Sequence, residues 1–190
     1  MNSTYFIEKS FEKINSAEIY LSKGDYERCT FSFCDFSNFN FSGFNFIDCE
    51  FIECNLSLAK LNATSFQNIL FENCKMVGLN FENCNPFLLS FQFENCILNH
   101  SNFYELQIPK TIFKNSELKE VDFSNCNLNQ SVFENSNLSE AIFENSNLEK
   151  ADFRTAQNYS IHPENNRIKH AKFSMEGVAG LLYRYGIDLD

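Results

Sequence analysis

A fixed five-residue period dominates the chain between Thr111 and Phe153, where every fifth residue is Phe or Leu. A small residue stands two positions before each large one, such as Ser116 or Ala141. This period fits neither an α-helix, with about 3.6 residues per turn, nor a strand, whose side chains alternate with a period of about two. It predicts a chain that turns a corner every five residues, closes a four-sided coil every twenty, and points its large residues at the axis. The predicted core residues of this stretch are Phe113, Leu118, Phe123, Leu128, Phe133, Leu138, Phe143, Leu148 and Phe153.

The same period extends toward the N-terminus and is interrupted once. From Tyr26 it holds to Phe81, and it resumes two residues late from Leu88. Asn85-Pro86 within the interruption is a turn signal that breaks strand pairing. Two interpretations of this phase slip near 84–88 stay open. It is a simple bulge in the rod, or it is a loop with a binding role, since loops on rigid scaffolds often carry function.

The period divides the chain into three parts. Residues 1–24 are non-repetitive and predict an N-terminal cap, because a solenoid needs its ends covered. Residues 25–173 predict the repeat domain of about six to seven coils, with a degenerate last coil at 154–173. Residues 174–190 predict a short α-helix and a tail. Apolar residues at i, i+3, i+4 and i+7 give this helix one stripe. They are Val178, Leu181, Leu182 and Tyr185.

The composition excludes several classes of function. The formal net charge of −10 disfavours nonspecific binding to nucleic acid or to an anionic membrane. No apolar run approaches the roughly 20 residues needed to cross a bilayer, and the N-terminus lacks the apolar segment of a secretory signal. We therefore expect one cytoplasmic domain with no nucleic-acid partner and no membrane partner.

Eight cysteines are the strongest candidates for chemistry, but they follow the repeat. Each stands two positions before a repeat centre or its slipped equivalent, so the fold imposes their spacing, and no Cys-x-x-Cys occurs. Buried Cys acting as a small apolar residue is the favoured interpretation. The alternative, a metal site, would use the thiols of Cys29, Cys34, Cys49 and Cys54. The three histidines have no ligand spacing, so we predict no catalytic residue, no metal and no cofactor, and we do not expect an enzyme.

The acidic residues supply the candidate interaction surface. From Asp25 to Phe153 the chain has eighteen acidic and seven basic residues, so this region carries about −11. A rod of about seven coils, each about 4.8 Å high, then carries about one net negative charge per 3 Å, against one per about 1.7 Å for duplex DNA. The charge makes the rod a diluted imitation of DNA, and acidity that serves only solubility is the alternative. No basic residue occurs from Cys29 to Ala59, where the acidic residues are Asp35, Asp48, Glu50 and Glu53.

The repeat resembles the pentapeptide-repeat family, whose motif is A-(D/N)-L-x-x with Phe alternating for Leu, as in Ala151-Asp152-Phe153. The resemblance covers residues 26–153 and implies an all-β fold, a right-handed quadrilateral β-helix. The rod, the cap and the terminal helix together are similar to the DNA-gyrase-interacting group of this family, which includes MfpA, AlbG, McbG and the Qnr quinolone-resistance proteins. The tail at 161–168, followed by residues 177–187, is similar to the end of McbG in particular.

The resemblance implies a function for both the helix and the charge. In that group the terminal helix pairs two rods into a homodimer, and the acidic surface occupies the DNA site of DNA gyrase or topoisomerase IV. This predicts a DNA mimic that protects a topoisomerase from a toxin or a drug, as an immunity or antibiotic-resistance protein does. Qnr proteins carry two sizeable loops, whereas this chain has only the two-residue slip, so quinolone protection does not follow directly. The alternative is a rigid scaffold for a different protein partner, since the fold fixes no partner.

Overall fold

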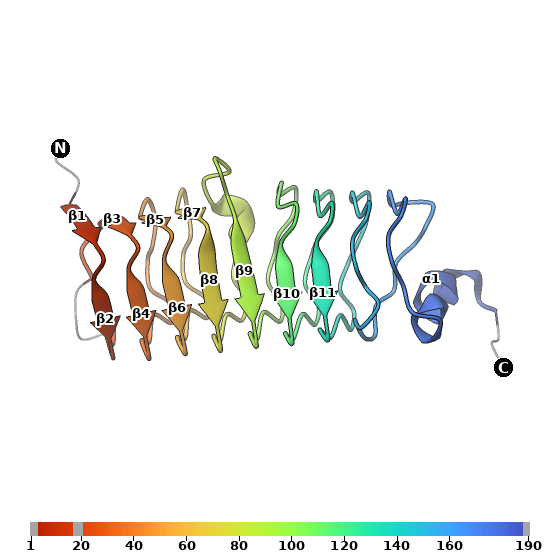
Figure 1. The fold of residues 1–190 in the computed structure, drawn as a ribbon, viewed down its shortest axis with the longest axis horizontal. Coiled ribbons are helices and arrows are strands. Elements are labelled where there is room, and N and C mark those ends of the chain that lie inside the picture. The colour runs from red at the N-terminus through yellow and green to blue at the C-terminus, as the bar shows by residue number, and fades with distance from the viewer. Residues whose placement is uncertain (1–3, 17–20, 188–190) are drawn as a thin grey trace.

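The computed structural model describes residues 4–16 and 21–187, which form a β-helix whose coils stack along one axis (Figure 1). Two parallel sheets run along the rod, on adjacent sides. The four-stranded sheet has the order β1 (Thr4–Ile7), β3 (Gly24–Glu27), β5 (Asn45–Ile47) and β7 (Ser65–Gln67). The seven-stranded sheet has the order β2 (Ser10–Glu12), β4 (Thr30–Ser32), β6 (Glu50–Ile52), β8 (Ile69–Glu72), β9 (Phe91–Glu94), β10 (Ile112–Lys114) and β11 (Val132–Glu134). The remaining sides pair through isolated parallel bridges, such as Asp122 with Ile142. The predicted right-handed quadrilateral β-helix is confirmed.

The corners of the coils explain the five-residue period, because each is a single residue in the left-handed region of φ. Asn115, Asn125, Asn135 and Asn145 occupy every second corner of the regular second half, with φ between 50° and 57°. Asn tolerates this conformation better than most residues with a Cβ atom. The corner amide then reaches the next coil, as the Asn115 N–H donates to the Glu134 carbonyl at 2.8 Å. Short strands and tight corners are thus one repeating unit.

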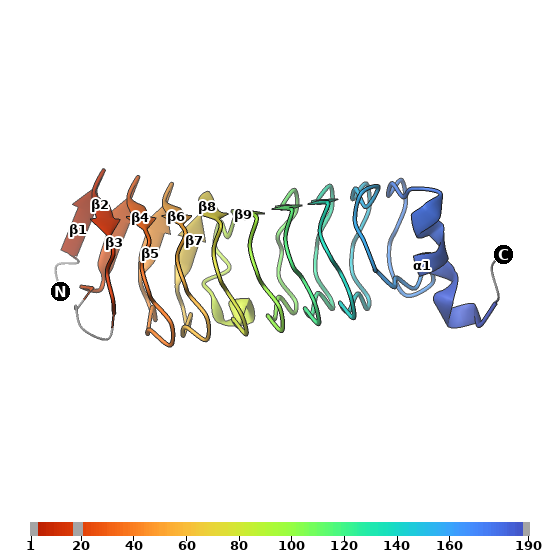
Figure 2. The same ribbon diagram turned by 90° about the horizontal axis from the view of Figure 1, so that it is seen from below.

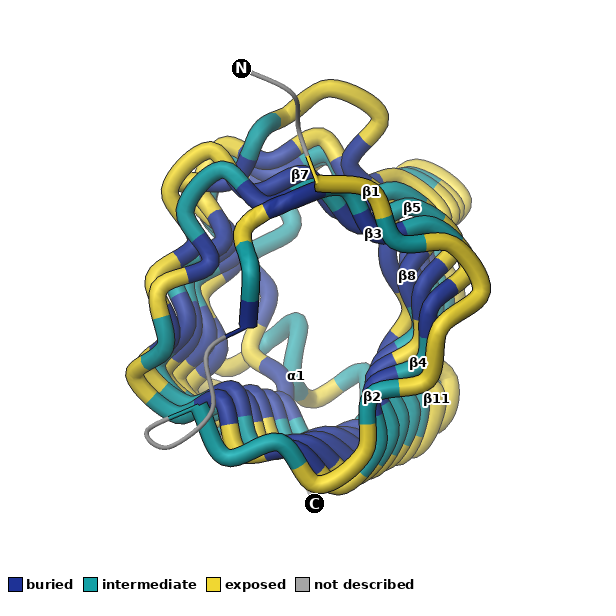
Figure 3. Tube along the Cα trace, turned by 90° about the vertical axis from the view of Figure 1, so that its left-hand side faces the viewer, coloured by how far each residue is buried: buried dark blue, intermediate teal, exposed yellow. Residues whose placement is uncertain are grey.

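Aromatic rings fill one side of the interior from end to end. Nine Phe rings stack in consecutive coils, with neighbouring centroids 4.7–5.4 Å apart. The nine predicted core residues from Phe113 to Phe153 are all at most 2% exposed. Figure 3 shows buried residues along the inner wall on every side. The stacked rings are Phe11, Phe31, Phe51, Phe71, Phe93, Phe113, Phe133, Phe153 and Phe173.

The repeat begins before residue 25, in a segment whose sequence predicts a non-repetitive cap. Strands β1 and β2 pair in register with β3 and β4, which places Phe6 opposite Tyr26 and Phe11 opposite Phe31. Ser16 follows the bridge that aligns this coil with the next, and so takes the position that holds a Phe one coil later. A small polar residue at that position hides the period from the sequence. Residues 1–3 and 17–20 of the predicted cap lie outside the described residues.

The phase slip near 84–88 is a two-residue insertion. Strand β6 pairs with β8 at a spacing of twenty residues, Phe51 opposite Phe71, whereas β8 pairs with β9 at twenty-two, Phe71 opposite Phe93. The four-stranded sheet ends before this insertion, at β7. Leu88, which the period places inside, is 63% exposed with φ of 55°, and Leu89 is buried in its place. The insertion therefore shifts the inward position by one residue and restores the register at β9.

The degenerate last coil keeps the register of the rod. Phe173 stacks on Phe153 with centroids 5.4 Å apart and rings only 4° from parallel. Parallel bridges join Asn147 to Arg167 and Asp152 to Lys172 across the same coil. The repeat thus continues as far as residue 173.

The C-terminal segment closes the rod. Helix α1 (Ala179–Leu182) is flanked by 3₁₀ turns at Glu176–Val178 and Tyr183–Tyr185, and it lies across the end of the last coil (Figure 2). The Ile161 N–H donates to the Gly180 carbonyl at 3.0 Å, which ties this segment to the coil. The final residues, 188–190, lie outside the described range. Across the described residues, no helix has the length and apolar character needed to span a bilayer.

Candidate interaction surfaces

The four predicted acidic residues lie on two sides of the rod. Asp48, Glu50 and Glu53 follow one another around β6, and Asp48 and Glu53 are corner residues with φ of 52°. Asp35 lies on the next side, one coil earlier, where it bridges to Asn55. All four side chains are exposed. The structure therefore brings three of them together on one edge and places the fourth around a corner.

Hydrogen bonds fix the orientation of two of these carboxylates. Asp35 accepts from the Ser37 N–H at 2.9 Å and from Asn55 Nδ2 at 3.3 Å. The Ser37 amide is the main cause that lowers the pKa of the Asp35 carboxyl below its ordinary value. Asp48 accepts from Asn68 Nδ2 at 2.7 Å. The orientation of both groups is thus fixed by the coil beside them.

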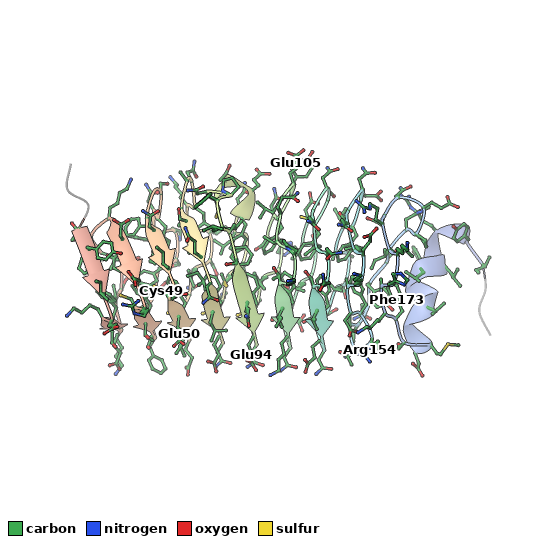
Figure 4. The ribbon with its side chains drawn as sticks, turned by 45° about the horizontal axis from the view of Figure 1, so that its top comes forward. Cys49, Glu50, Glu94, Glu105, Arg154 and Phe173 are labelled. Atoms are coloured by element: carbon green, nitrogen blue, oxygen red, sulfur yellow. The ribbon has the colours of Figure 1, made fainter. Side chains whose placement is uncertain are left out.

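The stretch from Cys29 to Ala59 has carboxylates and no basic residue, whereas several carboxylates in the second half of the rod pair with cations. Glu94 pairs with Lys114 at 2.6 Å, Glu149 pairs with Arg167 at 2.9 Å, and Arg154 pairs with an aspartate at 2.7 Å. Glu50, Glu94 and Arg154 follow one another along the rod in Figure 4. The last coil, residues 154–172, holds one acidic and four basic residues, a net charge of +3. The net charge is therefore not uniform along the rod, and it reverses sign in the last coil.

Two exposed apolar residues that the sequence does not single out as surface lie in the insertion. Phe87 is 67% exposed and Leu88 is 63% exposed. The turn signal Asn85-Pro86 predicts a break at this point, but the five-residue period assigns Leu88 to the core. Leu88 has a left-handed φ of 55°, which periodicity alone does not reveal.

The four stripe residues of the C-terminal segment do not share one outward surface. Leu181 packs against the core of the last coil, while Val178 and Leu182 are half-buried. Tyr185 is 50% exposed, and its hydroxyl contacts Glu164 Oε1 at 3.3 Å.

Residues outside the stripe supply most of the exposed apolar surface at this end of the rod. Met175 is 85% exposed and Tyr183 is 79% exposed. Three short helical turns replace the single helix that a regular stripe requires, so the i, i+3, i+4 spacing does not place these residues.

The thiols are part of the interior. All eight cysteines are buried and free. Burial raises the pKa of the Cys49 and Cys126 thiols to about 12, so both are protonated at neutral pH. The Cys54 and Cys74 thiols contact carbonyls of the preceding coil, at 3.3 Å and 3.2 Å. Among the residues that the structure describes, no group of three or more His, Cys, Asp or Glu is arranged to hold a metal ion.

Comparison with known proteins identifies the repeat. Residues 25–92 and 88–173 match the model of the pentapeptide repeat region. Among solved structures, the fold is similar to full-length QnrB1, a plasmid-mediated fluoroquinolone resistance protein, with 16% identity and a TM-score of 0.64 over 97% of this chain and 100% of that one. A trypsin-treated QnrB1 variant gives 17% identity and a TM-score of 0.63 over the whole of both chains. No curated protein matches the sequence. The family match spans most of the sequence, and the chain belongs to the pentapeptide-repeat family.

Proposed function

We propose that this protein is a DNA-mimicking rod that binds DNA gyrase or topoisomerase IV and protects it from a toxin or a drug. The observation that carries the proposal is the row of exposed carboxylates around β6, in a stretch from Cys29 to Ala59 without a basic residue. These charges stand on a rigid rod whose fold resembles that of a fluoroquinolone resistance protein over its whole length. The protein acts by occupying a site, without chemistry of its own, in the cytoplasm where its target works.

The physical basis is electrostatic complementarity. A topoisomerase site that accepts duplex DNA is positively charged, and a rod with about −11 between Asp25 and Phe153 is attracted to such a site. Long-range attraction raises the association rate and weakens with added salt. Because the backbone corners fix the axial position of each carboxylate, the rod loses little conformational entropy when it binds.

We infer further that two rods join through their C-terminal segments into a homodimer. Val178, Leu182 and Tyr185 of the predicted stripe remain partly exposed there, and Tyr183 adds an exposed ring. Leu181, which packs inward, would hold the segment in place and leave the contact to its neighbours.

Two charged variants separate these roles of the C-terminal segment. Tyr183→Asp should give folded monomers by sedimentation, because the charge enters an exposed contact. Leu181→Asp should loosen the end of the rod. A Tyr183→Asp protein that still sediments as a dimer would rule out this interface.

The alternative is a rigid scaffold for another protein partner. The net charge of +3 in the last coil favours it, because a mimic of uniformly charged DNA has no reason to reverse sign toward one end. A partner with both basic and acidic surfaces would fit such a rod better than a DNA-binding groove does.

The deciding experiment is gyrase supercoiling titrated with this protein, with and without a fluoroquinolone. We expect inhibition that fades with added salt, or relief of drug-stabilised cleavage. The test variant neutralises the three carboxylates around β6 together with Asp35 on the next side, with Asp35→Asn, Asp48→Asn, Glu50→Gln and Glu53→Gln. The matched control makes the same change in net charge at carboxylates that lie within ion-pair distance of a base, with Glu94→Gln, Glu117→Gln, Glu144→Gln and Glu149→Gln.

The proposal predicts that the first variant loses inhibition and the control keeps most of it. No inhibition and no binding by the unmodified protein at tens of micromolar would refute the proposal and leave the scaffold. Equal loss of inhibition in both variants would show that net charge alone matters and that the carboxylates at and beside β6 have no special role.

A further inference from the structure

The two-residue insertion forms a loop, residues 86–89, that stands out from the row of turns just before β9 (Figure 1). Two of its exposed residues, Phe87 and Leu88, are large and apolar and lie outside the interior. Leu89 and Phe91 fill the core at this level and are 7% and 3% exposed. The loop therefore places two large apolar side chains in water although the core is complete without them.

Both ends of the loop are anchored to the preceding coil. At its start, the Asn85 N–H donates to the Thr64 carbonyl at 2.8 Å. At its end, the Ser90 N–H donates to the Phe66 carbonyl at 3.0 Å. Within it, the Phe87 N–H donates to Asn85 Oδ1 at 3.0 Å. A loop held in this way needs little ordering when it binds, so its apolar contacts convert more fully into affinity.

A chain of hydrogen bonds links the loop to the acidic surface around β6. Asn68 Nδ2 donates to Asp48 Oδ1 at 2.7 Å, and the Asn68 N–H donates to Ser90 Oγ at 2.8 Å. Ser90 Oγ in turn donates to the Leu88 carbonyl at 3.4 Å. The apolar pair and the carboxylates thus belong to one continuous edge of the rod.

A groove runs along this edge. Its acidic part, about 230 Å³, is lined by Asp48 and Glu50 together with Asn68 and Gln92. The two amide residues also line a neighbouring hollow that reaches Lys110. The groove is therefore acidic on the N-terminal side of the loop and carries one cation on the other side.

We propose that Phe87 and Leu88 insert into an apolar pocket of the protein partner, and that basic side chains bordering this pocket pair with Asp48 and Glu50. The inference rests on the proposed function, since it takes the topoisomerase as that partner. A buried aromatic anchor surrounded by polar contacts is the usual composition of an interface hot spot. Single exposed apolar residues are ordinary, but an adjacent pair on an anchored loop in a regular surface is not.

Charge complementarity selects this occupant over a second copy of the chain. A second rod, with a net charge of −10, would bring its own carboxylates toward Asp48 and Glu50. Repulsion between like charges would oppose that contact. A basic protein surface meets no such penalty.

The sharpest test removes the loop and leaves the coil. Deleting Pro86 and Phe87 restores the twenty-residue spacing between Phe71 and Phe93 and returns Leu88 to the inward position. Two point variants, Phe87→Ala and Leu88→Ser, remove the side chains singly. The matched control is Phe33→Ala, which truncates a 50% exposed ring at a regular corner. Binding to purified DNA gyrase is measured at several salt concentrations, and thermal melting checks that each variant is folded.

We expect the deletion and Phe87→Ala to weaken gyrase binding by about tenfold or more, as truncating a hot-spot aromatic does, with Phe33→Ala unchanged. The salt dependence should persist in the loop variants and become shallower in Asp48→Asn/Glu50→Gln. If the unmodified protein binds but the loop variants bind equally well, the inference is wrong and the proposed function stands. If the unmodified protein does not bind gyrase, both are overturned.

Discussion

The small residues beside the Phe column are thiols in the first half of the rod and hydroxyls in the second. Cys34, Cys54, Cys74 and Cys96 occupy this column before Ser116 and Ser136 continue it. Cys54 Sγ contacts the Phe31 carbonyl at 3.3 Å, and Ser136 Oγ contacts the Phe113 carbonyl at 3.1 Å. Each acceptor lies twenty-three residues earlier in the chain.

The comparison shows what the repeat requires at this position. The repeat fixes a geometric place for a small side chain, and at these six positions either sulfur or oxygen fills it with one proton to donate. The two halves therefore share one architecture, but they differ in ionisation, because a thiol titrates within the range that proteins survive and a hydroxyl does not. Experiments on matched positions can test how far the equivalence goes.

The largest effect should come from the aromatic column, equally in both halves. Phe51 and Phe133 are fully buried and sit between two stacked rings. Replacing either with Ala should lower the free energy of unfolding by about 3–5 kcal/mol, because a cavity is left that rigid coils cannot close. Chemical denaturation measures this, with Phe33→Ala as the exposed control. A much smaller loss at one of the two buried sites would break the equivalence of the halves.

The next effect is a loss of stability at alkaline pH, which the buried thiols cause and the hydroxyls of the column do not. Burial raises the pKa of the Cys49 thiol to about 12 and raises that of Cys84 as well, and a hydrogen bond with Cys54 raises that of Cys34. The ordinary thiol value is 9.0. The folded state therefore keeps protons that the unfolded chain releases, so this stabilisation is complete below pH 9 and falls as pH rises toward 12. Each such thiol should remove about 1.4 kcal/mol of unfolding free energy per pH unit in that window.

The measurement is denaturant unfolding at pH 8 and at pH 10.5. The control is a Cys34→Ser/Cys54→Ser/Cys74→Ser variant, whose stability should depend less steeply on pH because its column resembles the second half. A pH dependence as steep in this variant as in the unmodified protein would assign the alkaline loss to other groups.

Exchanging the two side chains directly should have a smaller effect. Cys54→Ser and Ser136→Cys each keep a donor near the same carbonyl, so we expect a change of about 1 kcal/mol or less in unfolding free energy. Alanine at each position is the control, since it removes the donor. A loss above about 3 kcal/mol in either exchange would mean that the column distinguishes sulfur from oxygen.

The smallest effect on stability should come from the boundary between the halves. Deleting Pro86 and Phe87 should change the free energy of unfolding by about 0.5 kcal/mol or less, because Leu88 then takes the inward place of Leu89 and shortening an exposed loop changes its closure entropy only slightly. Thermal melting and denaturant titration measure this. A large loss of stability would show that the insertion is part of the packing that joins the two halves.

Periodicity predicts the structure correctly wherever the same residue type recurs at the same position of the repeat. The Phe column, the four-sided coil and the exposed β6 carboxylates all follow from counting fives and twenties. The first coil is missed because Ser16 stands where a large residue is expected. Leu88 is placed on the wrong side because an insertion lets a neighbour take its position.

The predicted short C-terminal helix is present, but tertiary contact decides where its stripe residues lie. Gly180 packs so tightly on Tyr159 that a Cβ atom there would lie 2.3 Å from the tyrosine carbonyl oxygen. Beside this close approach, Leu181 packs against the core and the segment consists of short helical turns. Hydrophobic periodicity carries no information about such a contact, so the predicted stripe does not survive as one surface.

The stacking distance of the coils gives the rod an axial repeat that differs from the axial repeat of DNA. Successive coils are about 4.8 Å apart, whereas successive base pairs of DNA are about 3.4 Å apart. Five coils therefore span nearly the same length as seven base pairs, and charges in one column come into step with phosphate levels only at that interval. A partner that accepts this rod in place of DNA would respond to its width and its field, because a phosphate-by-phosphate match fails between those levels. Moving one carboxylate from coil to coil along a column would then measure, in steps of fixed length, how far the partner's cations reach.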